Sequence, residues 1–266
     1  MDDDSTPIEL VIIGGGNTGA ALLGGLLDSG AFDASAIAVV EVVAARRDVL
    51  ASQFPGVRIE AAVPPCGGAV VAVKPADTPA AASAAGAGGA TRVLSIAAGV
   101  RLATIEAAAG SDVAVIRAMP NTPALVRLGA CAIAAGATAH RDDVSWARRI
   151  LEAVGTVDEV DESALDAFTG VAGSGPAYVF LVAEALIDAA VAEGLEPDMA
   201  QRVVRQLLLG SATLLDREGD PTRLREMVTS PNGTTAAGLA ALAERDLRGA
   251  FGAAVRAATH RSRELG

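Results

Sequence analysis

The sequence contains few positively charged residues, and almost all of them are arginine. Lysine and arginine together number 21 against 32 aspartates and glutamates, so the formal net charge is −11. Lys74 is the only lysine in the chain. Nucleic acids and anionic membrane surfaces both require a basic face on their partner. We therefore expect neither of them as a partner of this protein.

Cysteine and histidine are scarce as well. Cys66 and Cys131 are the only cysteines, and neither stands in a CxxC pair, so we expect no disulfide framework. Reduced thiols in a cytoplasmic protein are the expected state. His140 and His260 are the only histidines, and they lie outside every motif described below. We expect both at the surface without a catalytic role, and we expect no metal site.

Targeting and membrane segments are not evident in the sequence. Met1 is followed by three aspartates, which is unlike the basic start of a signal peptide. No uninterrupted apolar run reaches the ~18 residues of a membrane span. Aromatic residues make up only 3% of the chain although 51% of it is hydrophobic. We therefore expect a core of closely packed small side chains.

Short apolar strands alternate with helices in the first part of the chain. Residues 8–13 are apolar with one acidic break, which is typical of a strand covered on both faces. Alternating β and α units predict an α/β fold with a doubly wound, mostly parallel sheet, on which we expect Trp146 to pack. The predicted strands are 8–13, 37–42, 57–60, 69–73, 92–96, 113–117 and 130–134, and the predicted helices are 17–27, 45–53 and 80–90.

The pattern changes after Glu162, where helical periodicity replaces the strand runs. Three of the four expected helices start with proline at or near the first turn, where its missing N–H is harmless. We predict a dinucleotide-binding domain at 1–162 and an all-helical domain at 163–266. The predicted helices of the second domain are 176–193, 197–218, 221–228 and 234–264.

A glycine-rich loop follows the first predicted strand. Residues 14–19 read Gly-Gly-Gly-Asn-Thr-Gly, which fits GxGxxG, and they open the next predicted helix. The first glycine allows a tight turn, the second lets a pyrophosphate approach the backbone, and the third lets the helix lie close to the strand. The helix N-terminus then favours the anion. The loop predicts a Rossmann-type domain that binds a nicotinamide dinucleotide, with an ordinary strand-to-helix turn as the alternative.

Glu41 ends the second predicted strand, 22 residues after Gly19. An acidic group at this point accepts hydrogen bonds from the adenosine ribose diol, which favours NAD over NADP. A surface glutamate is the alternative. Arg46 and Arg47 could contact a 2′-phosphate, but we expect both on a solvated helix face. The choice between NADP and NAD therefore stays open.

Five further motifs follow the glycine loop. Ala-Val-Lys-Pro (72–75), Ser-Ile-Ala-Ala-Gly (95–99) and Met-Pro-Asn-Thr-Pro (119–123) lie at the carboxyl ends of predicted parallel strands. Open α/β sheets bind their ligands at this edge. The helical part contributes Gly-Ser-Gly-Pro-Ala-Tyr (173–178), whose tyrosine we expect in the core, and Thr-Ser-Pro-Asn-Gly-Thr-Thr (229–235).

The motifs and their order closely resemble those of the pyrroline-5-carboxylate reductases, the enzymes of the last step of proline synthesis. The resemblance covers nearly the whole chain. It implies hydride transfer from NADPH or NADH to the imine of 1-pyrroline-5-carboxylate, which gives L-proline. The sequence departs from the family at Asn232, where glycine is usual, and at Glu41 and Val42, where serine or arginine is common.

The resemblance also implies how the cofactor and the subunits are arranged. Lys74 would reach the ribose or phosphate, and Asn121 would touch the nicotinamide end, with an Asx-type turn before Pro123 as the alternative. The helical domain would interlock with that of a second subunit, in a homodimer or a larger homo-oligomer such as a decamer. The expected cofactor-binding residues are Ile13, Gly14, Gly16, Asn17, Thr18, Gly19, Glu41, Ala72, Lys74, Pro75, Ala97, Ala98 and Asn121.

The substrate is expected at the last motif. Its carboxylate needs an anion site, and residues 230–235 precede a predicted helix whose free N–H groups would face an anion. By resemblance, the carboxylate lies on the backbone of Gly233, Thr234 and Thr235, with Ser230 in the same site. Helix capping by Ser230 or Thr234 is the alternative.

Two residues are the candidate catalytic groups. By resemblance, the Thr235 hydroxyl lies near the ring nitrogen of the substrate. Glu218 falls where the family has an acidic residue, and its charge would stabilise the iminium form. An exposed glutamate at a helix end is the alternative for Glu218. Little other machinery is expected, because a protonated imine is already electrophilic and the protein mainly orients the reactants.

Two other functions fit parts of the sequence. A β-hydroxyacid dehydrogenase also joins a Rossmann domain to helices, but it depends on a lysine in the helical part, and no lysine follows Lys74. A dinucleotide-sensing protein whose helices bind partners would not require the loop at 230–235.

Overall fold

The computed structural model describes residues 7–265, which form two compact units. The described residues up to Ser174, together with those from Arg256 onward, form the sheet unit, and Gly175–Val255 forms the helical unit. The functional domain boundary after residue 162 stays a prediction. The acidic start at residues 1–6, where we expect no signal peptide, lies outside the described residues.

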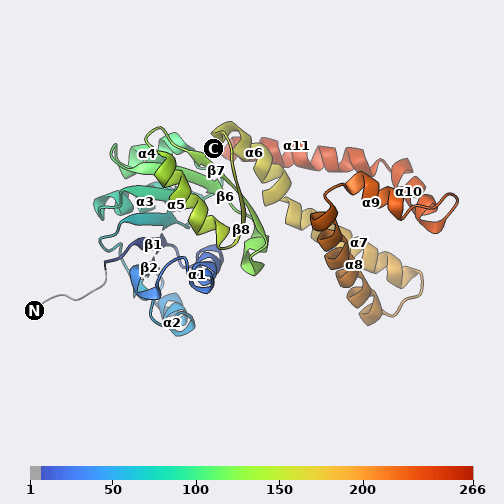
Figure 1. The fold of residues 1–266 in the computed structure, drawn as a ribbon, viewed down its shortest axis with the longest axis horizontal. Helices are drawn as coiled ribbons and strands as arrows, with labels where there is room; N and C mark the ends of the chain where they lie inside the picture. Colours follow the sequence, from blue (N-terminus) through green and yellow to red (C-terminus); the bar gives the residue numbers. More distant parts are fainter. Residues whose placement is uncertain (1–6, 266) are drawn as a thin grey trace, which may run out of the picture. The chain divides into compact units, whose positions relative to one another are not determined.

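An eight-stranded sheet forms the centre of the sheet unit (Figure 1). The strand order is β3-β2-β1-β4-β5-β6-β7-β8, and only β6 and β7 pair in the antiparallel sense. These two strands are joined by a short connection, whereas a parallel pair needs a crossover of a dozen or more residues. The prediction of a doubly wound, mostly parallel sheet is confirmed. The strands are β1 (Leu10–Ile13), β2 (Ile37–Val40), β3 (Arg58–Glu60), β4 (Gly68–Val71), β5 (Arg92–Ser95), β6 (Ala114–Met119), β7 (Gly129–Ala135) and β8 (Gly155–Glu159).

Helices cover both faces of this sheet. Ile12 of β1 packs with Leu23 in one buried cluster, which also takes in side chains of α2 and α5. The next residue along the strand, Ile13, belongs to a second cluster with Ile105 on the other face, together with side chains of α3 and α6. The helices of this unit are α1 (Asn17–Ser29), α2 (Ala44–Gln53), α3 (Thr78–Ala87), α4 (Leu102–Ala109), α5 (Arg141–Glu152) and α6 (Leu165–Phe168).

Short helical turns connect several of these elements. Four are of the 3-10 type, and the fifth, η5, is a π-helical turn that directly follows α6. Trp146 of α5 is 6% exposed and packs against Gly68 of β4, so its predicted position on the sheet is confirmed. The turns are η1 (Ala34–Ala36), η2 (Pro75–Asp77), η3 (Thr122–Val126), η4 (Glu162–Ala164) and η5 (Thr169–Gly173).

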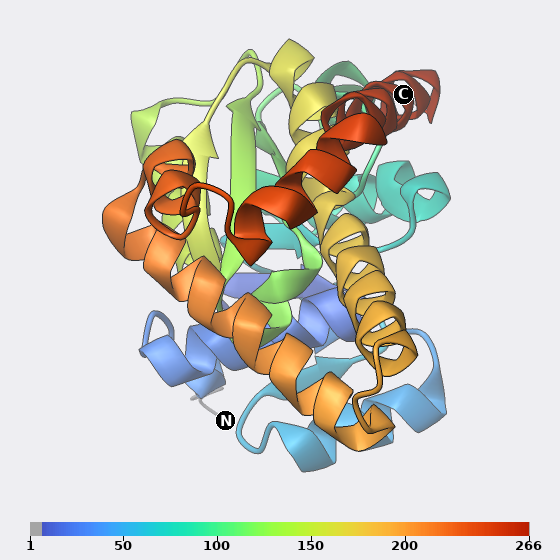
Figure 2. The ribbon, with the colours of Figure 1, turned by 90° about the vertical axis from the view of Figure 1, so that its right-hand side faces the viewer.

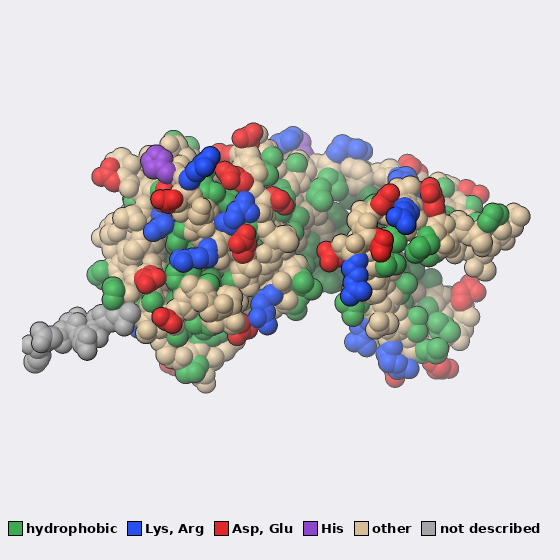
Figure 3. Space-filling model, in the orientation of Figure 1, with side chains coloured by type: hydrophobic (Ala, Val, Ile, Leu, Met, Phe, Trp, Pro, Cys, Tyr) green, Lys and Arg blue, Asp and Glu red, His purple; other side chains and the backbone are tan. Residues whose placement is uncertain are grey.

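The helical unit is built from long helices with little buried surface. α7 and α8 contact each other and diverge away from the loop that joins them (Figure 2). Among the described residues of this unit, Ala200 and Val204 are the only buried hydrophobic ones, and apolar side chains are visible on its surface in Figure 3. Its helices are α7 (Gly175–Ala192), α8 (Pro197–Glu218), α9 (Pro221–Met227), α10 (Thr234–Glu244) and the first part of α11 (Leu247–Leu265).

The prediction of one continuous helix over 234–264 is wrong. The chain breaks at Asp246, which adopts a left-handed φ of 50°. The Asp246 carboxylate accepts a hydrogen bond from the Gly249 N–H at 3.1 Å and thereby caps α11. Aspartate is a preferred N-cap residue and tolerates the left-handed region, so one residue both ends α10 and starts α11.

One helical stretch, Glu162–Ala192, is long and apolar enough to cross a membrane by length and composition alone. Its most apolar window has a mean hydropathy of 1.6, and none of that window is buried in the chain. The expectation from uninterrupted runs overlooked it, because Glu184 and Asp188 interrupt the apolar residues. Such a stretch also suits a helix that packs against a second subunit.

Candidate active site

The glycine loop between β1 and α1 has the geometry expected of GxGxxG. Gly14 has a φ of +110°, and a Cβ on it would lie 2.5 Å from the Ala72 carbonyl oxygen. A Cβ on Gly19 would collide with the Gly14 carbonyl oxygen, so only glycine lets α1 approach the strand this closely. A Cβ on Gly16 would meet no atom within 4 Å. Gly14 and Gly19 are therefore required by the fold, whereas Gly16 leaves open space at the helix N-terminus.

The first turn of α1 is free to bind an anion. Gly16 is the N-cap residue and provides no side-chain hydrogen bond. Within the described chain, the N–H groups of Asn17, Thr18 and Gly19 have no acceptor, and the first N–H to be paired is that of Ala20, with the Gly16 carbonyl. These N–H groups and the open space beside Gly16 fit the pyrophosphate of a dinucleotide.

Glu41 follows β2 and is fixed beside the same loop. Its Oε2 accepts a hydrogen bond from the Gly15 N–H at 3.2 Å, and its Oε1 accepts one from the Val43 N–H at 2.9 Å. A carboxylate can accept further hydrogen bonds after these two. Glu41 is thus held where an adenosine ribose would lie next to a pyrophosphate on the loop.

Arg46 and Arg47 do not project from a solvated helix face, so that expectation is wrong. Both are half-buried. Arg46 Nε donates to the Gly15 carbonyl at 2.8 Å, and Arg47 Nη1 donates to the Glu41 carbonyl at 2.9 Å. The first turn of α2 places both guanidinium groups against the loops that follow β1 and β2.

A pocket of about 380 Å³ lies at the carboxyl ends of the central strands. It brings together residues from four of the motifs, which are far apart in the sequence. Among the described residues that line it, none has an ionisable side chain. The lining residues are Asn17, Thr18, Ala21, Ile96, Ala98, Met119, Pro120, Asn121, Thr122, Ala124, Leu125 and Gly173.

Asn121 joins three segments around this pocket. Its Nδ2 donates to the Ala172 carbonyl in the π-helical turn at 3.1 Å, and its Oδ1 accepts from the Ala130 N–H at 2.9 Å. In the structure, these contacts hold the Met-Pro-Asn-Thr-Pro loop to η5 and to the start of β7. A contact of Asn121 with the nicotinamide stays a prediction.

The other predicted cofactor residues lie along the same edge of the sheet. Ile13 is the last residue of β1, and Ala72 follows β4 next to Gly14. Ala97 is buried directly after β5. Lys74 and Pro75 are exposed at the start of η2. Sequence reasoning did not single out Met119 or Gly173 for this site, although both stand in motifs that it named.

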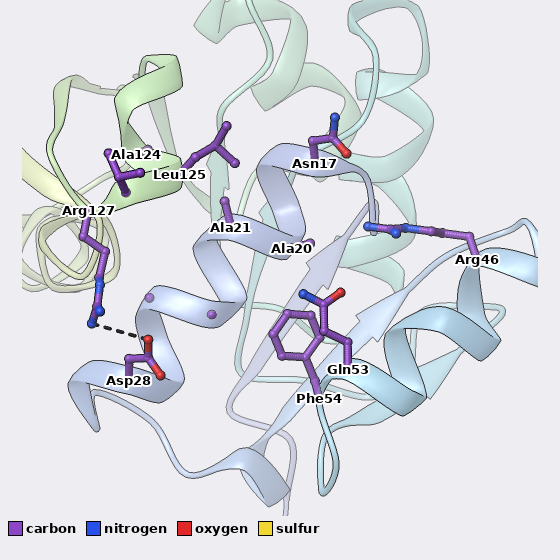
Figure 4. Close-up of a pocket in the computed structure, with 13 residues that line it drawn as sticks. Asn17, Ala20, Ala21, Asp28, Arg46, Gln53, Phe54, Ala124, Leu125 and Arg127 are labelled. Carbon is purple, nitrogen blue, oxygen red and sulfur yellow. Dashed lines mark ion pairs between the residues drawn. The ribbon is translucent and has the colours of Figure 1, made fainter. Parts of the chain in front are cut away.

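A larger groove of about 580 Å³ runs along the outer side of α1 (Figure 4). Arg46 extends from α2 toward the first turn of α1 at one end of it. At the other end, Arg127 forms an exposed ion pair with Asp28 at 3.4 Å. The groove shares Asn17, Ala21, Ala124 and Leu125 with the smaller pocket but carries none of the strand-end motifs.

The last motif forms a tight loop before α10 in the helical unit. Asn232 has a φ of 58°, in the left-handed region that asparagine tolerates better than most residues. This explains how asparagine replaces the glycine usual in the resembling family. Gly233 is the N-cap of α10 and provides no side chain, and the N–H groups of Thr234, Thr235 and Ala236 find no acceptor among the described residues. The loop therefore offers an anion site.

Glu218 and Ser230 are exposed, and Thr235 is half-buried. Glu218 is the last residue of α8, and its side chain makes no hydrogen bond or ion pair within residues 7–265. Their roles toward a substrate stay predictions. Tyr178 is half-buried near the start of α7.

The histidines and cysteines lie apart from the pocket. His140 and His260 are both exposed, as predicted, and the His140 N–H donates to Asp143 Oδ2 at 2.9 Å at the start of α5. Cys66 and Cys131 are free and buried, and burial raises the pKa of Cys131 to about 11. In the described part of the chain, no three histidine, cysteine or acidic side chains are grouped to hold a metal ion.

A Rossmann-type sheet with an anion-binding glycine loop and a strand-end pocket defines a nicotinamide-dinucleotide-dependent oxidoreductase. Residues 9–99 match the family model of the NADP oxidoreductases described as coenzyme F420-dependent. Residues 162–265 match the model of pyrroline-5-carboxylate reductase dimerisation.

Proteins from several organisms are similar over nearly the full length. The pyrroline-5-carboxylate reductase of Synechocystis is 44% identical, covering 97% of this chain and 98% of its own. That of Mycobacterium tuberculosis is 39% identical, covering 96% of both chains. The solved pyrroline-5-carboxylate reductase of Coxiella burnetii has a TM-score of 0.91 at 33% identity and covers 98% of this chain and 99% of its own. The chain belongs to the pyrroline-5-carboxylate reductase family.

Proposed function

We propose that this protein reduces 1-pyrroline-5-carboxylate to L-proline with NADPH or NADH, the last step of proline biosynthesis. The observation that carries this is the pocket of about 380 Å³, in which the glycine loop meets the strand-end motifs without any ionisable side chain among the described lining residues. A reaction that needed a protein acid beside the nicotinamide would be poorly served there. An iminium substrate is already activated and needs chiefly orientation.

When bound, a reduced nicotinamide would supply the hydride for the ring carbon of the protonated imine, whose nitrogen already carries the proton that the product amine keeps. The N–H groups of Asn17, Thr18 and Gly19 would hold the pyrophosphate, and Ala97, Ala98 and Asn121 would border the nicotinamide half.

The helical unit would supply the substrate groups. In our proposal, the free N–H groups at the start of α10 bind the substrate carboxylate, as helix N-termini bind anions. The Thr235 hydroxyl would contact the ring nitrogen, and Glu218 would favour its protonated, charged form. Ser230 is exposed at the start of the same loop and would complete the site.

We infer that NADH is preferred over NADPH. Glu41 is fixed by the Gly15 and Val43 N–H groups and would accept hydrogen bonds from a ribose diol, while its charge would repel a 2′-phosphate. The nearby guanidinium groups of Arg46 and Arg47 are anchored to backbone carbonyl oxygens through Nε and Nη1 respectively. A related structure from Plasmodium falciparum, 26% identical, has NADP bound.

The dimerisation domain indicates a homo-oligomer, and we propose a homodimer at least, built on the exposed helices of the helical unit, with assembly to a decamer as the finer possibility. In this arrangement one subunit's sheet unit works with the partner's helices. The net charge of −11 supports a cytoplasmic protein without nucleic-acid or membrane partners.

The direct test is to supply 1-pyrroline-5-carboxylate with NADH and, separately, with NADPH, and to follow the loss of absorbance of the reduced cofactor. We expect oxidation that depends on the substrate, with formation of proline. If neither cofactor is oxidised, the proposed function is wrong. A preference for NADPH of about tenfold or more, roughly 1.4 kcal/mol, would contradict the role given to Glu41.

A further inference from the structure

Two buried polar contacts connect the segment after β5 with the end of the chain. Asp166 of α6 is 2% exposed. Its Oδ1 accepts a hydrogen bond from Ser262 Oγ of α11 at 2.8 Å, and its Oδ2 lies 3.3 Å from Arg101 Nη1. Ser262 is itself 6% exposed. All three residues belong to the sheet unit, so the C-terminal turn of α11 is tied to the residues that follow the Ser-Ile-Ala-Ala-Gly motif.

The same segment is held at two more points. Gly99 has a φ of +77°, and a Cβ built on it would lie 3.1 Å from the Cβ of Leu265. Leu102 follows Gly99 by three residues, and its N–H donates to Glu162 Oε1 at 2.7 Å. The same oxygen accepts a hydrogen bond from Arg117 Nη1 at 2.8 Å. Residues from η4, α6 and α11 thus fix the backbone between Gly99 and Leu102.

This segment adjoins the candidate nicotinamide pocket. Ala98, one residue before Gly99, lines the pocket. α6, which carries Asp166, runs directly into the π-helical turn η5, whose last residue, Gly173, lines the pocket as well. Asp166 therefore links two parts of the pocket wall, and Ser262 is the residue of α11 that holds Asp166 in place.

We propose that Ser262 is a positioning residue for the dinucleotide: through Asp166 and Arg101 it fixes the Ala97–Gly99 backbone against which the nicotinamide half lies. Without the hydroxyl, a buried carboxylate oxygen loses its donor, which is costly. Asp166 would then draw Arg101 toward itself or take up water, and the wall at Ala98 would shift. The proposal rests on the proposed function only in that this pocket binds the cofactor.

The test compares the full-length Ser262→Ala variant with the unsubstituted protein. The measurements are a titration with NADH followed by its fluorescence, thermal melting, and steady-state kinetics. We expect the dissociation constant of NADH to rise about fivefold or more, which is about 1 kcal/mol. We expect Ser262→Thr, which keeps the hydroxyl, to restore it. Arg263→Ala is the matched control, since this neighbour in the same turn is exposed. The KM for 1-pyrroline-5-carboxylate should change less than about twofold.

A lower melting temperature with unchanged NADH affinity would show a merely structural contact and overturn the proposal. Unchanged affinity and unchanged melting would overturn it too. If Ser262→Ala fails to fold, Asp166→Asn in the full-length chain gives the same titration from the other side of the contact. The NADH titration does not need turnover, so an inactive full-length protein would contradict the proposed function and leave this measurement interpretable.

Discussion

The sheet unit and the helical unit differ in where their apolar residues lie. The sheet unit buries two clusters, one on each face of the sheet, and almost all of the buried hydrophobic residues belong to it. The helical unit leaves large apolar side chains such as Phe180, Leu181 and Leu209 about 60% exposed, at 59%, 64% and 62%. Exposed apolar surface on this scale marks an interaction site. The sheet unit thus has a core of its own, whereas the helices need a second copy of the chain to cover them.

The two candidate anion sites differ in how far the surrounding residues of one chain enclose them. The glycine loop is backed by β1, by β4 and by Glu41, and its shape is set within the sheet unit. The loop before α10 lies at the surface, with Ser230 and Asn232 exposed. We therefore expect the first site to bind its ligand in a single chain and the second to depend on the assembled oligomer.

The largest effect is expected from a side chain at Gly16. Because a Cβ there meets no atom within 4 Å, Gly16→Val should fold normally and yet block the pyrophosphate. We expect the dissociation constant of NADH to rise about a hundredfold, or about 2.8 kcal/mol. Isothermal titration and melting together check this. Gly19→Ala is the counterpart, since its Cβ would collide with the Gly14 carbonyl, and it should lower the melting temperature.

A charge on the exposed face of α7 should abolish turnover and leave NADH binding intact. Leu181→Glu places a carboxylate on apolar surface that we propose is covered in the oligomer, so subunits should dissociate. We expect light scattering to give the mass of a monomer, with turnover lost and NADH binding retained. Ala80→Glu adds the same charge to an exposed position of α3 and should leave the assembly intact. An unchanged mass for Leu181→Glu would remove α7 from the interface.

A smaller effect is expected at the adenosine end. Glu41→Ser removes the carboxylate that we expect to bind the ribose diol and to repel a 2′-phosphate. The ratio of kcat/KM for NADH to that for NADPH should fall about tenfold or more, roughly 1.4 kcal/mol. Steady-state assays with both cofactors measure the ratio. No change in it would mean that Glu41 only braces the loop.

A pH-dependent effect concerns a thiol in the core of the sheet unit. Burial raises the pKa of Cys131 to about 11, above its ordinary value of 9.0. The folded state therefore keeps its proton at a pH where the unfolded state has lost it, and stability should be constant below pH ~9 and fall as the pH rises from ~9 to ~11. Denaturant unfolding should show a loss of about 1 kcal/mol per pH unit in this window, and the loss should be smaller in Cys131→Ala.

Local sequence patterns were sufficient for the sheet, the glycine loop and most helix starts, because apolar runs, glycines and prolines act over a few residues. The strand-end motifs also lie on one edge, as the parallel topology requires. α4, α5 and β8 were not predicted, although the acidic residues Asp142 and Asp143 in the first turn of α5 were a usable signal. The break between α10 and α11 also had a local signal, because Asp246 is an aspartate placed to cap a following helix through the Gly249 N–H.

Contacts between distant segments could not be read from the sequence. Asn121 binds Ala172, Arg46 binds Gly15, and Ser262 binds Asp166, and each pair joins residues at least 31 positions apart in the sequence. The π-helical turn at Thr169–Gly173 was not predicted either, although its glycines at 170 and 173 are poor formers of an ordinary helix. These contacts decide how the pocket is shaped, whereas the motifs decide only where it lies.

The central claim is that the sheet unit binds the cofactor and the helical unit binds the substrate. Thr235→Val tests it most directly, because it removes one hydroxyl from the helical unit and keeps the side chain's size. We expect kcat for 1-pyrroline-5-carboxylate to fall about tenfold or more while the dissociation constant of NADH stays within about twofold. Thr213→Val, at an exposed position of α8, is the control. Full turnover in Thr235→Val, or a parallel loss of NADH affinity, would contradict a substrate site in the helices and a cofactor site in the sheet unit.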